Sequence, residues 1–145
     1  MKKFELTNEF ITNMFGTKLF RIRALVEFGD VEAGELGGYV EKESNLGHDD
    51  NAWVYDNAWV YGNARVCGDA RVCGNGDYAY AHGFGSVNRT TTFFRLKDGG
   101  VGVRCGCFYG TLAQFRDKIR ETHGETKKAQ EYLMLADLMK LRFEK

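Results

Sequence analysis

Small and branched apolar residues recur at fixed positions through four consecutive hexapeptides in the middle of the chain. The hexapeptides read NAWVYD, NAWVYG, NARVCG and DARVCG and occupy residues 51–74 without an insertion. Ala and Val stand two positions apart in each one, so both side chains face the same side of an extended strand. Gly, Asn and Asp at the junctions tolerate the positive φ of a tight corner. The pattern predicts short strands with Ala and Val inward, separated by sharp turns.

A strict period of six residues is typical of a parallel β-solenoid, in which stacked coils share one core. If three hexapeptides make one coil, residues eighteen apart stack, and Trp53 lies against Arg71. Weaker repeats on both sides extend the array to between two and three coils. His48-Asp49-Asp50 adds two residues to the period, which indicates a corner that loops out.

The flanking segments differ from the repeats and predict caps. We expect an N-terminal β cap at residues 1–39, the hexapeptide-repeat β-solenoid at 40–86, and a C-terminal β-hairpin and two-helix domain at 87–145. Repeat arrays need such caps because each unit buries its apolar face only against its neighbours. The predicted fold class is therefore mainly β with α, built on a short parallel β-solenoid of about two to three coils.

The C-terminal segment predicts a hairpin followed by two helices. Thr90–Lys97 and Val101–Phe108 read as paired strands, and Thr111 opens a helix with capping-box spacing that ends at His123-Gly124. A second helix at Lys127–Arg142 has an apolar face broader than one stripe. Such a helix is buried inside its own fold or in a subunit interface, and we expect a homo-oligomer.

Charge and composition narrow the functional classes. The 145 residues include 20 Lys and Arg and 20 Asp and Glu, so no overall field favours nucleic acid or an anionic membrane. A localised basic pocket remains compatible with this balance. The charged N-terminus lacks the apolar core of a signal peptide, and no apolar stretch approaches the ~20 residues that cross a bilayer. We expect a cytoplasmic protein whose four cysteines are free thiols.

The polar stretch Gly85–Thr92 is the first candidate site. Hydroxyls, an amide, an arginine and glycine-flanked backbone amides are what an anionic ligand requires. Arg104 from the partner strand and the amides at the start of the first helix would add to them. The alternative is a plain β-turn followed by a Thr-rich edge strand. The predicted ligand-binding residues are Ser86, Asn88, Arg89, Thr90, Thr91, Arg104, Phe108 and Thr111.

The outward positions of the repeats form the second candidate site. Aromatic and arginine side chains stack on nucleobases, and they are also enriched in protein interfaces. The alternative is that they pack under the N-terminal segment or against a second chain. The predicted contact or interface residues are Trp53, Tyr55, Trp59, Tyr61, Arg65 and Arg71.

Cysteine and histidine give weaker signals. Cys105-Gly106-Cys107 would put two thiols on one face of a strand, but the C-x2-C pairs and helical Cys/His sets of zinc sites are missing from the sequence. We expect buried apolar cysteines, no metal and no cofactor. His82 lies on a degenerate repeat and would be the general base of a hexapeptide-type acyltransferase. A Ser/His/Asp or Cys/His catalytic set cannot be assembled, so catalysis is the weaker hypothesis.

Several motifs together resemble a family of bacteriophage and prophage proteins with N-A-x-V-x-G hexapeptide repeats. The shared motifs are Leu19–Leu25, Gly34–Glu41, the repeats themselves, Thr90–Phe94, Lys97–Gly100, Cys105–Leu112 and Glu121–Gly124. The resemblance covers nearly the whole chain. It implies a phage context and a β-solenoid core. Small phage accessory proteins of this kind often block host immunity, by sequestering a nucleotide signal or by binding a defence enzyme.

The leading functional hypothesis is a non-enzymatic phage counter-defence protein. It would sequester a small anionic, nucleotide-like immune signal in the cytoplasm of an infected or lysogenic bacterium. The first alternative is a protein-binding inhibitor of a host defence enzyme, similar to an anti-CRISPR protein, that acts through the aromatic repeat face. The weakest alternative is a hexapeptide-type acyltransferase.

Overall fold

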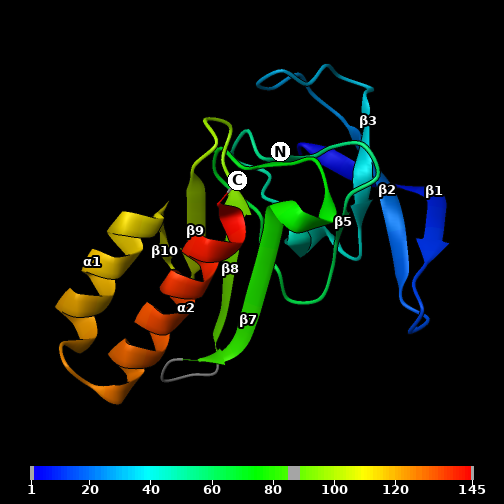
Figure 1. The fold of residues 1–145 in the computed structure, drawn as a ribbon. Coiled ribbons are helices and arrows are strands. Elements are labelled where there is room, and N and C mark those ends of the chain that lie inside the picture. Colours follow the sequence, from blue (N-terminus) through cyan, green and yellow to red (C-terminus); the bar gives the residue numbers. More distant parts are fainter. Residues whose placement is uncertain (1, 85–88, 145) are drawn as a thin grey trace.

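The computed structural model describes residues 2–84 and 89–144 and contains two four-stranded sheets, one two-stranded sheet and two helices (Figure 1). The first sheet has the strand order β1-β2-β3-β5, formed by Phe4–Thr12, Lys18–Ala24, Leu36–Val40 and Trp59–Val60. The second has the order β10-β9-β8-β7, formed by Phe108–Thr111, Val101–Cys105, Arg89–Arg95 and Tyr78–Phe84. The two-stranded sheet pairs β4 (Trp53–Val54) with β6 (Arg71–Val72).

The predicted parallel β-solenoid is wrong as a description of this fold. The strands lie in three separate sheets, and the long strand pairs, β1 with β2 and β7 with β8, are antiparallel. Three of the four hexapeptides form strands of only two residues, and the third contributes an isolated bridge at Val66, which is too little to carry a continuous parallel ladder. Tight turns connect β1 to β2 and β8 to β9, and such connections impose antiparallel pairing.

Within the hexapeptides, the local pattern holds. The inward Ala and Val of all four repeats are at most 3% exposed, as their two-residue spacing predicts. Trp53 pairs in parallel with Arg71, eighteen residues on, as predicted. Val40, which precedes residues 48–50, pairs with Val60, twenty residues further along the chain. The spacing of twenty exceeds the spacing of eighteen by two residues, which are the two extra residues predicted at residues 48–50.

The weaker repeats after residue 74 do not continue the pattern. Tyr78–Phe84 is instead one continuous strand, β7, that pairs antiparallel with β8. No glycine interrupts the sequence Tyr78–His82, so the chain has no corner there and extends.

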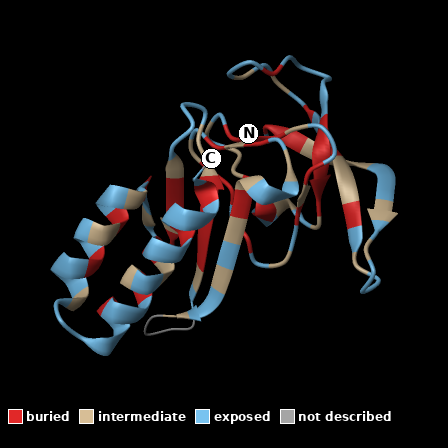
Figure 2. Ribbon diagram, viewed as in Figure 1, coloured by how far each residue is buried: buried red, intermediate tan, exposed pale blue. Residues whose placement is uncertain are grey.

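Strand β8 separates two hydrophobic cores. Phe93 and Phe94 are adjacent and both fully buried, and because side chains alternate along a strand they enter different clusters. Phe94 packs in the core shared by the N-terminal strands and the repeats. Phe93 packs in the core between the sheet and the helices. Figure 2 shows the buried residues concentrated in the strands, while both helices keep an exposed outer side. β8 is therefore a central strand, not the edge strand that we considered.

The C-terminal hairpin and both helices are confirmed, but the predicted strand Val101–Phe108 is divided by a turn into β9 and β10. β8 and β9 pair as a hairpin around residues 96–100, where the Leu96 N–H donates to the Gly100 carbonyl and the Gly99 N–H donates to the Leu96 carbonyl. Helix α1 (Leu112–His123) begins with the predicted capping box, in which Thr111 accepts from the Gln114 N–H, and ends at Gly124. Helix α2 runs from Lys127 to Phe143.

Helix α2 buries one face and exposes part of another. Its buried residues are Ala129, Tyr132, Ala136, Met139 and Phe143. Met134, Leu138 and Leu141 are more than half exposed. The homo-oligomer expected from this broad apolar helix stays a prediction. No helix in the described residues 2–84 and 89–144 has both the length and the apolar character needed to span a bilayer.

A buried lysine joins the N-terminus to the inserted loop. Lys3 is 3% exposed and its ammonium donates to Asp50 Oδ1, to the Asp50 carbonyl and to the Ala52 carbonyl. Burial lowers the pKa of Lys3, although Asp50 opposes that shift. The Asp50 carboxylate also accepts from the Ala52 and Gly68 N–H groups. The two-residue insertion therefore supplies the anchor for the first strand.

Replacing Lys3 should test this anchor. Lys3→Ala leaves a half-buried carboxylate without its cation and two carbonyls without their donor, so we expect a loss of about 3 kcal/mol in unfolding free energy. Urea denaturation followed by circular dichroism measures it. Lys2→Ala is the matched control, since Lys2 forms an exposed ion pair with Glu43 and should cost less than about 1 kcal/mol. Equal losses in both variants would contradict the anchoring role.

Candidate functional site

Four cationic side chains line one cleft of about 610 Å³, which we call the basic cleft. They are Lys42, Arg65, Arg89 and Arg104. No carboxylate belongs to the described residues that line it. The remaining lining residues are Ser44, Asn63, His82, Thr90, Gly106 and Cys107. The chain has no net charge, so this concentration of positive charge is a product of the fold.

The first wall of the basic cleft is held by a fully buried asparagine. Asn45 Oδ1 accepts from the Lys42 and Glu41 N–H groups. Its amide nitrogen donates to the carbonyls of Gly62 and Ala64. These four bonds satisfy the buried amide and hold residues 42–44 beside residues 63–65. Lys42 and Ser44 therefore face the same cleft as Asn63 and Arg65.

The second wall is the end of the sheet β7-β8-β9. His82 pairs with Thr90 across β7 and β8, and His82 Nδ1 lies 2.7 Å from Thr90 Oγ1. Arg104 on β9 pairs with Thr92 on β8. The Thr92 hydroxyl accepts from the Arg65 N–H at 3.0 Å, which joins the repeat wall to the sheet wall.

The turn between β9 and β10 shapes the cleft floor. Cys105 pairs with Phe108, so the turn contains only Gly106 and Cys107, and Gly106 has φ of +60°. A glycine with positive φ at the first position of a two-residue hairpin is the arrangement of a type II′ turn. A Cβ at this position would overlap the Arg89 guanidinium. Arg104 Nε donates to the Gly106 carbonyl at 3.0 Å. The turn thus positions both arginines.

The cleft cations lack direct ion pairs among the described residues, although Glu43 and Asp49 line an adjoining hollow that Arg65 and Arg104 also line. None of its four cations forms an ion pair with a described carboxylate, whereas arginines elsewhere do. Arg104 lies near the Cys67 thiol, where burial raises the pKa of Cys67 and the arginine opposes that rise. Like charges gathered without direct ion pairs create a local positive potential that favours an anionic ligand.

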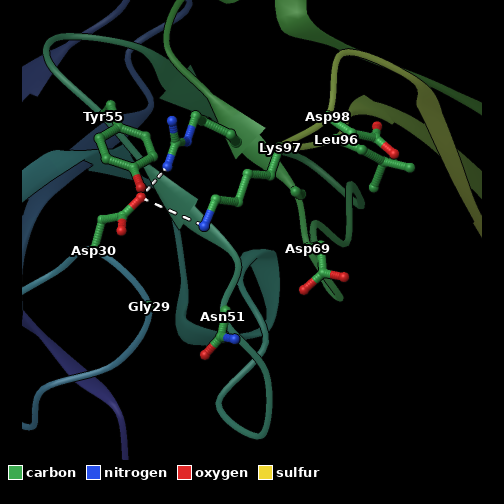
Figure 3. Close-up of a pocket in the computed structure, with 10 residues that line it drawn as sticks. Gly29, Asp30, Asn51, Tyr55, Asp69, Leu96, Lys97 and Asp98 are labelled. Atoms are coloured by element: carbon green, nitrogen blue, oxygen red, sulfur yellow. Dashed lines mark hydrogen bonds and ion pairs between the residues drawn. The ribbon is translucent and has the colours of Figure 1, made fainter.

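A second cavity, of about 500 Å³, provides a contrast (Figure 3). Its cations are already paired, since Arg71 and Lys97 both contact Asp30, as the dashed lines in Figure 3 mark. Arg71 also lies over the Tyr55 ring at 5.3 Å. Asp69 and Asp98 add further negative charge to the lining. This cavity therefore offers no unopposed positive charge to an anion.

The structure brings together only part of the predicted ligand site. Arg89, Thr90 and Arg104 all line the basic cleft. Thr91 is fully buried and donates to Cys105 Sγ, and Thr111 caps α1. Phe108 lines a separate pocket beside the helices. Ser86 and Asn88 lie outside the described residues.

The predicted contact face is dispersed. Trp53 is fully buried and packs edge-on against Phe4 and Phe28 of the N-terminal segment, so the outward placement is wrong for it and the packing alternative holds. Its indole N–H has no partner among the described residues. Tyr55 and Arg71 line the second cavity. Trp59 is half-buried, Tyr61 is exposed, and Arg65 belongs to the basic cleft.

The expectation of buried cysteines is confirmed for Cys67 and Cys105 but is wrong for Cys73 and Cys107, which are exposed. Cys105 ends β9 and is buried, but Cys107 lies in the turn and is exposed. The turn breaks the alternation on which the shared strand face depended. All four cysteines are unpaired thiols. Within residues 2–84 and 89–144, no three His, Cys, Asp or Glu side chains are grouped as metal ligands would be.

Sequence reasoning missed much of the first wall. Lys42, Ser44 and Asn63 had no local signal, and Arg65 was assigned to the contact face. Across the insertion, paired residues are twenty apart instead of eighteen, as the Leu46–Val66 bridge shows. Applying this spacing to the sequence would have placed Ser44 in the layer adjacent to that of Asn63. His82 was considered only as a catalytic base.

Comparison with known proteins adds no identification. Neither a protein-family model nor a curated protein matches the chain. The resemblance to hexapeptide-repeat phage proteins therefore stays a prediction.

Substitution of Gly106 should test the turn. We expect Gly106→Ala to lose roughly 1–2 kcal/mol of unfolding free energy from positive φ, with only a small added penalty because the overlapping atom is the end of the exposed Arg89 side chain. Gly99→Ala is the matched control, because Gly99 also has positive φ but has open space around it. Urea denaturation of both variants measures the difference. Equal destabilisation would show that the Arg89 contact contributes nothing.

Proposed function

We propose that the protein binds and sequesters a small anionic ligand, a phosphate compound of nucleotide type, in the basic cleft. The observation that carries the proposal is the convergence of Lys42, Arg65, Arg89 and Arg104 without a described carboxylate. The cleft volume of about 610 Å³ lies in the range of ordinary small-molecule sites.

The lining chemistry suits phosphate. Guanidinium groups donate two parallel hydrogen bonds to phosphate oxygens, and such charge-assisted bonds are stronger than neutral ones. Ser44, Asn63 and Thr90 add neutral donors at the same surface. Three arginines and one lysine match a ligand with more than one negative charge, such as a nucleotide.

Sequestration fits the site better than catalysis. Among the described hydrogen bonds of the cleft, the His82–Thr90 pair is the contact that resembles a base and a hydroxyl nucleophile, and both groups also serve as phosphate ligands. A third group that orients His82 is missing among its described hydrogen bonds. In the phage context that the sequence resemblance implies, capture of a nucleotide signal is a counter-defence activity. The protein-binding alternative is weakened by the burial of Trp53.

Charge removal at the cleft tests the site. Arg65 and Arg89 are exposed, so Arg65→Ala and Arg89→Ala should fold normally and each weaken pyrophosphate binding roughly tenfold, or ~1.4 kcal/mol. Isothermal titration calorimetry measures the affinity, which should also fall as salt rises.

Arg23→Ala is the matched control, since Arg23 is on β2 and pairs with Glu5. Unchanged binding in both cleft variants, or the same loss in the control, would refute the site. Mass spectrometry of small molecules released from protein purified out of infected cells should recover the ligand intact. Turnover that is abolished by His82→Ala would refute sequestration in favour of catalysis.

A further inference from the structure

Another hollow, of about 280 Å³ and different from the cavity in Figure 3, adjoins the basic cleft between helix α1 and the sheet. We call it the aromatic pocket. Its apolar wall consists of Phe108 from β10, Phe115 and Ile119 from α1, and Tyr132 from α2. Lys118, Thr122 and His123 supply polar groups. The other lining residues are Arg89, Cys105 and Cys107.

The aromatic rings that line this pocket pack against one another. The Phe115 ring lies 5.8 Å from the Phe108 ring and meets the Tyr132 ring edge-on, also at 5.8 Å. His123 stacks on Tyr132 at 5.9 Å. Phe115 and Tyr132 are at most 3% exposed, so the half-buried Phe108 and His123 are the rings that a planar ligand can reach. The buried rings behind them hold this surface in place, so a ligand would bind without ordering the wall.

Arg89 connects the two hollows. Arg89 and Cys107 line both the aromatic pocket and the basic cleft. The Arg89 guanidinium touches the Gly106 turn. Burial raises the pKa of Tyr132 to about 12, and the nearby Arg89 opposes that rise. A ligand with an apolar and an anionic part can therefore contact Arg89 from both sides.

We propose that the aromatic pocket receives the base of a nucleotide whose phosphate lies in the basic cleft, with Arg89 between them. This inference rests on the proposed function and specifies its ligand class. A nucleobase is planar and presents an aromatic face that stacks on rings, with hydrogen-bonding edges that Thr122, Lys118 and His123 can meet. A pocket of about 280 Å³ has room for one base.

Ligand comparison is the first test. The wild-type protein is titrated with the four ribonucleoside monophosphates, with ribose 5-phosphate and with inorganic phosphate. Stacking on the rings strengthens the binding of a base, so at least one nucleotide should bind about tenfold or more tightly than ribose 5-phosphate.

Filling the pocket is the second test. Thr122 is exposed on α1, and Thr122→Trp should close the pocket without disturbing the core. We expect nucleotide affinity to fall to that of ribose 5-phosphate, while the affinity for ribose 5-phosphate stays unchanged. Glu121→Trp is the matched control, because Glu121 is also exposed on α1 but does not line the pocket. Phe108→Ala should likewise weaken nucleotide binding and spare ribose 5-phosphate.

These experiments distinguish a failure of the base pocket from a failure of the proposed anion binding. If wild-type protein binds ribose 5-phosphate as tightly as every nucleotide, the base pocket is refuted and anion binding stands. Nucleotide selectivity that survives both Thr122→Trp and Phe108→Ala also refutes the pocket. If no phosphate compound binds, the proposed function fails, and the base pocket fails with it.

Discussion

Burial of strand β8 on both faces is the constraint on which the rest of the structure depends. Phe93 and Phe94 are each fully buried but face opposite cores. One face of the sheet must therefore carry the repeats and the other must carry the helices. Arg89 stands at the start of this strand, where the two sides meet, so the basic cleft and the aromatic pocket both reach it. The candidate site is a consequence of this two-sided packing.

A neutral chain can still present a strong local charge. Most arginines outside the basic cleft are matched by carboxylates, such as Arg71 by Asp30 and Arg95 by Asp77. The cleft cations lack such partners among the described residues, so they repel one another, and an anionic ligand would relieve that repulsion. Placing unpaired charges together costs stability, and the Asn45 bonds and the Arg65–Thr92 contact supply the local rigidity that maintains them.

Local features were predictable where one short segment sets the outcome. The inward Ala and Val, the β8–β9 hairpin, the capping box at Thr111 and the limits of both helices follow from spacing and turn chemistry. The solenoid did not follow, because the repeat period describes the hexapeptides alone. The antiparallel pairing of the longer strands around them determines the sheets. The continuous strand β7 shows the same limit, since its partner β8 lies outside the repeat.

The sequence by itself determined which residues are buried in each repeat, where the helices begin and end, and that Arg89, Thr90 and Arg104 are candidate anion ligands. Only the tertiary structure decided that Arg65 and Lys42 join them and that Trp53 lies in the core instead of on a contact face. The physical reason is that burial and turns depend on neighbouring residues, whereas charge convergence depends on packing between segments far apart in the chain. The two-residue insertion at 48–50 illustrates this difference: its spacing shows where it lies, but its role in anchoring Lys3 appears only when the N-terminus packs against it.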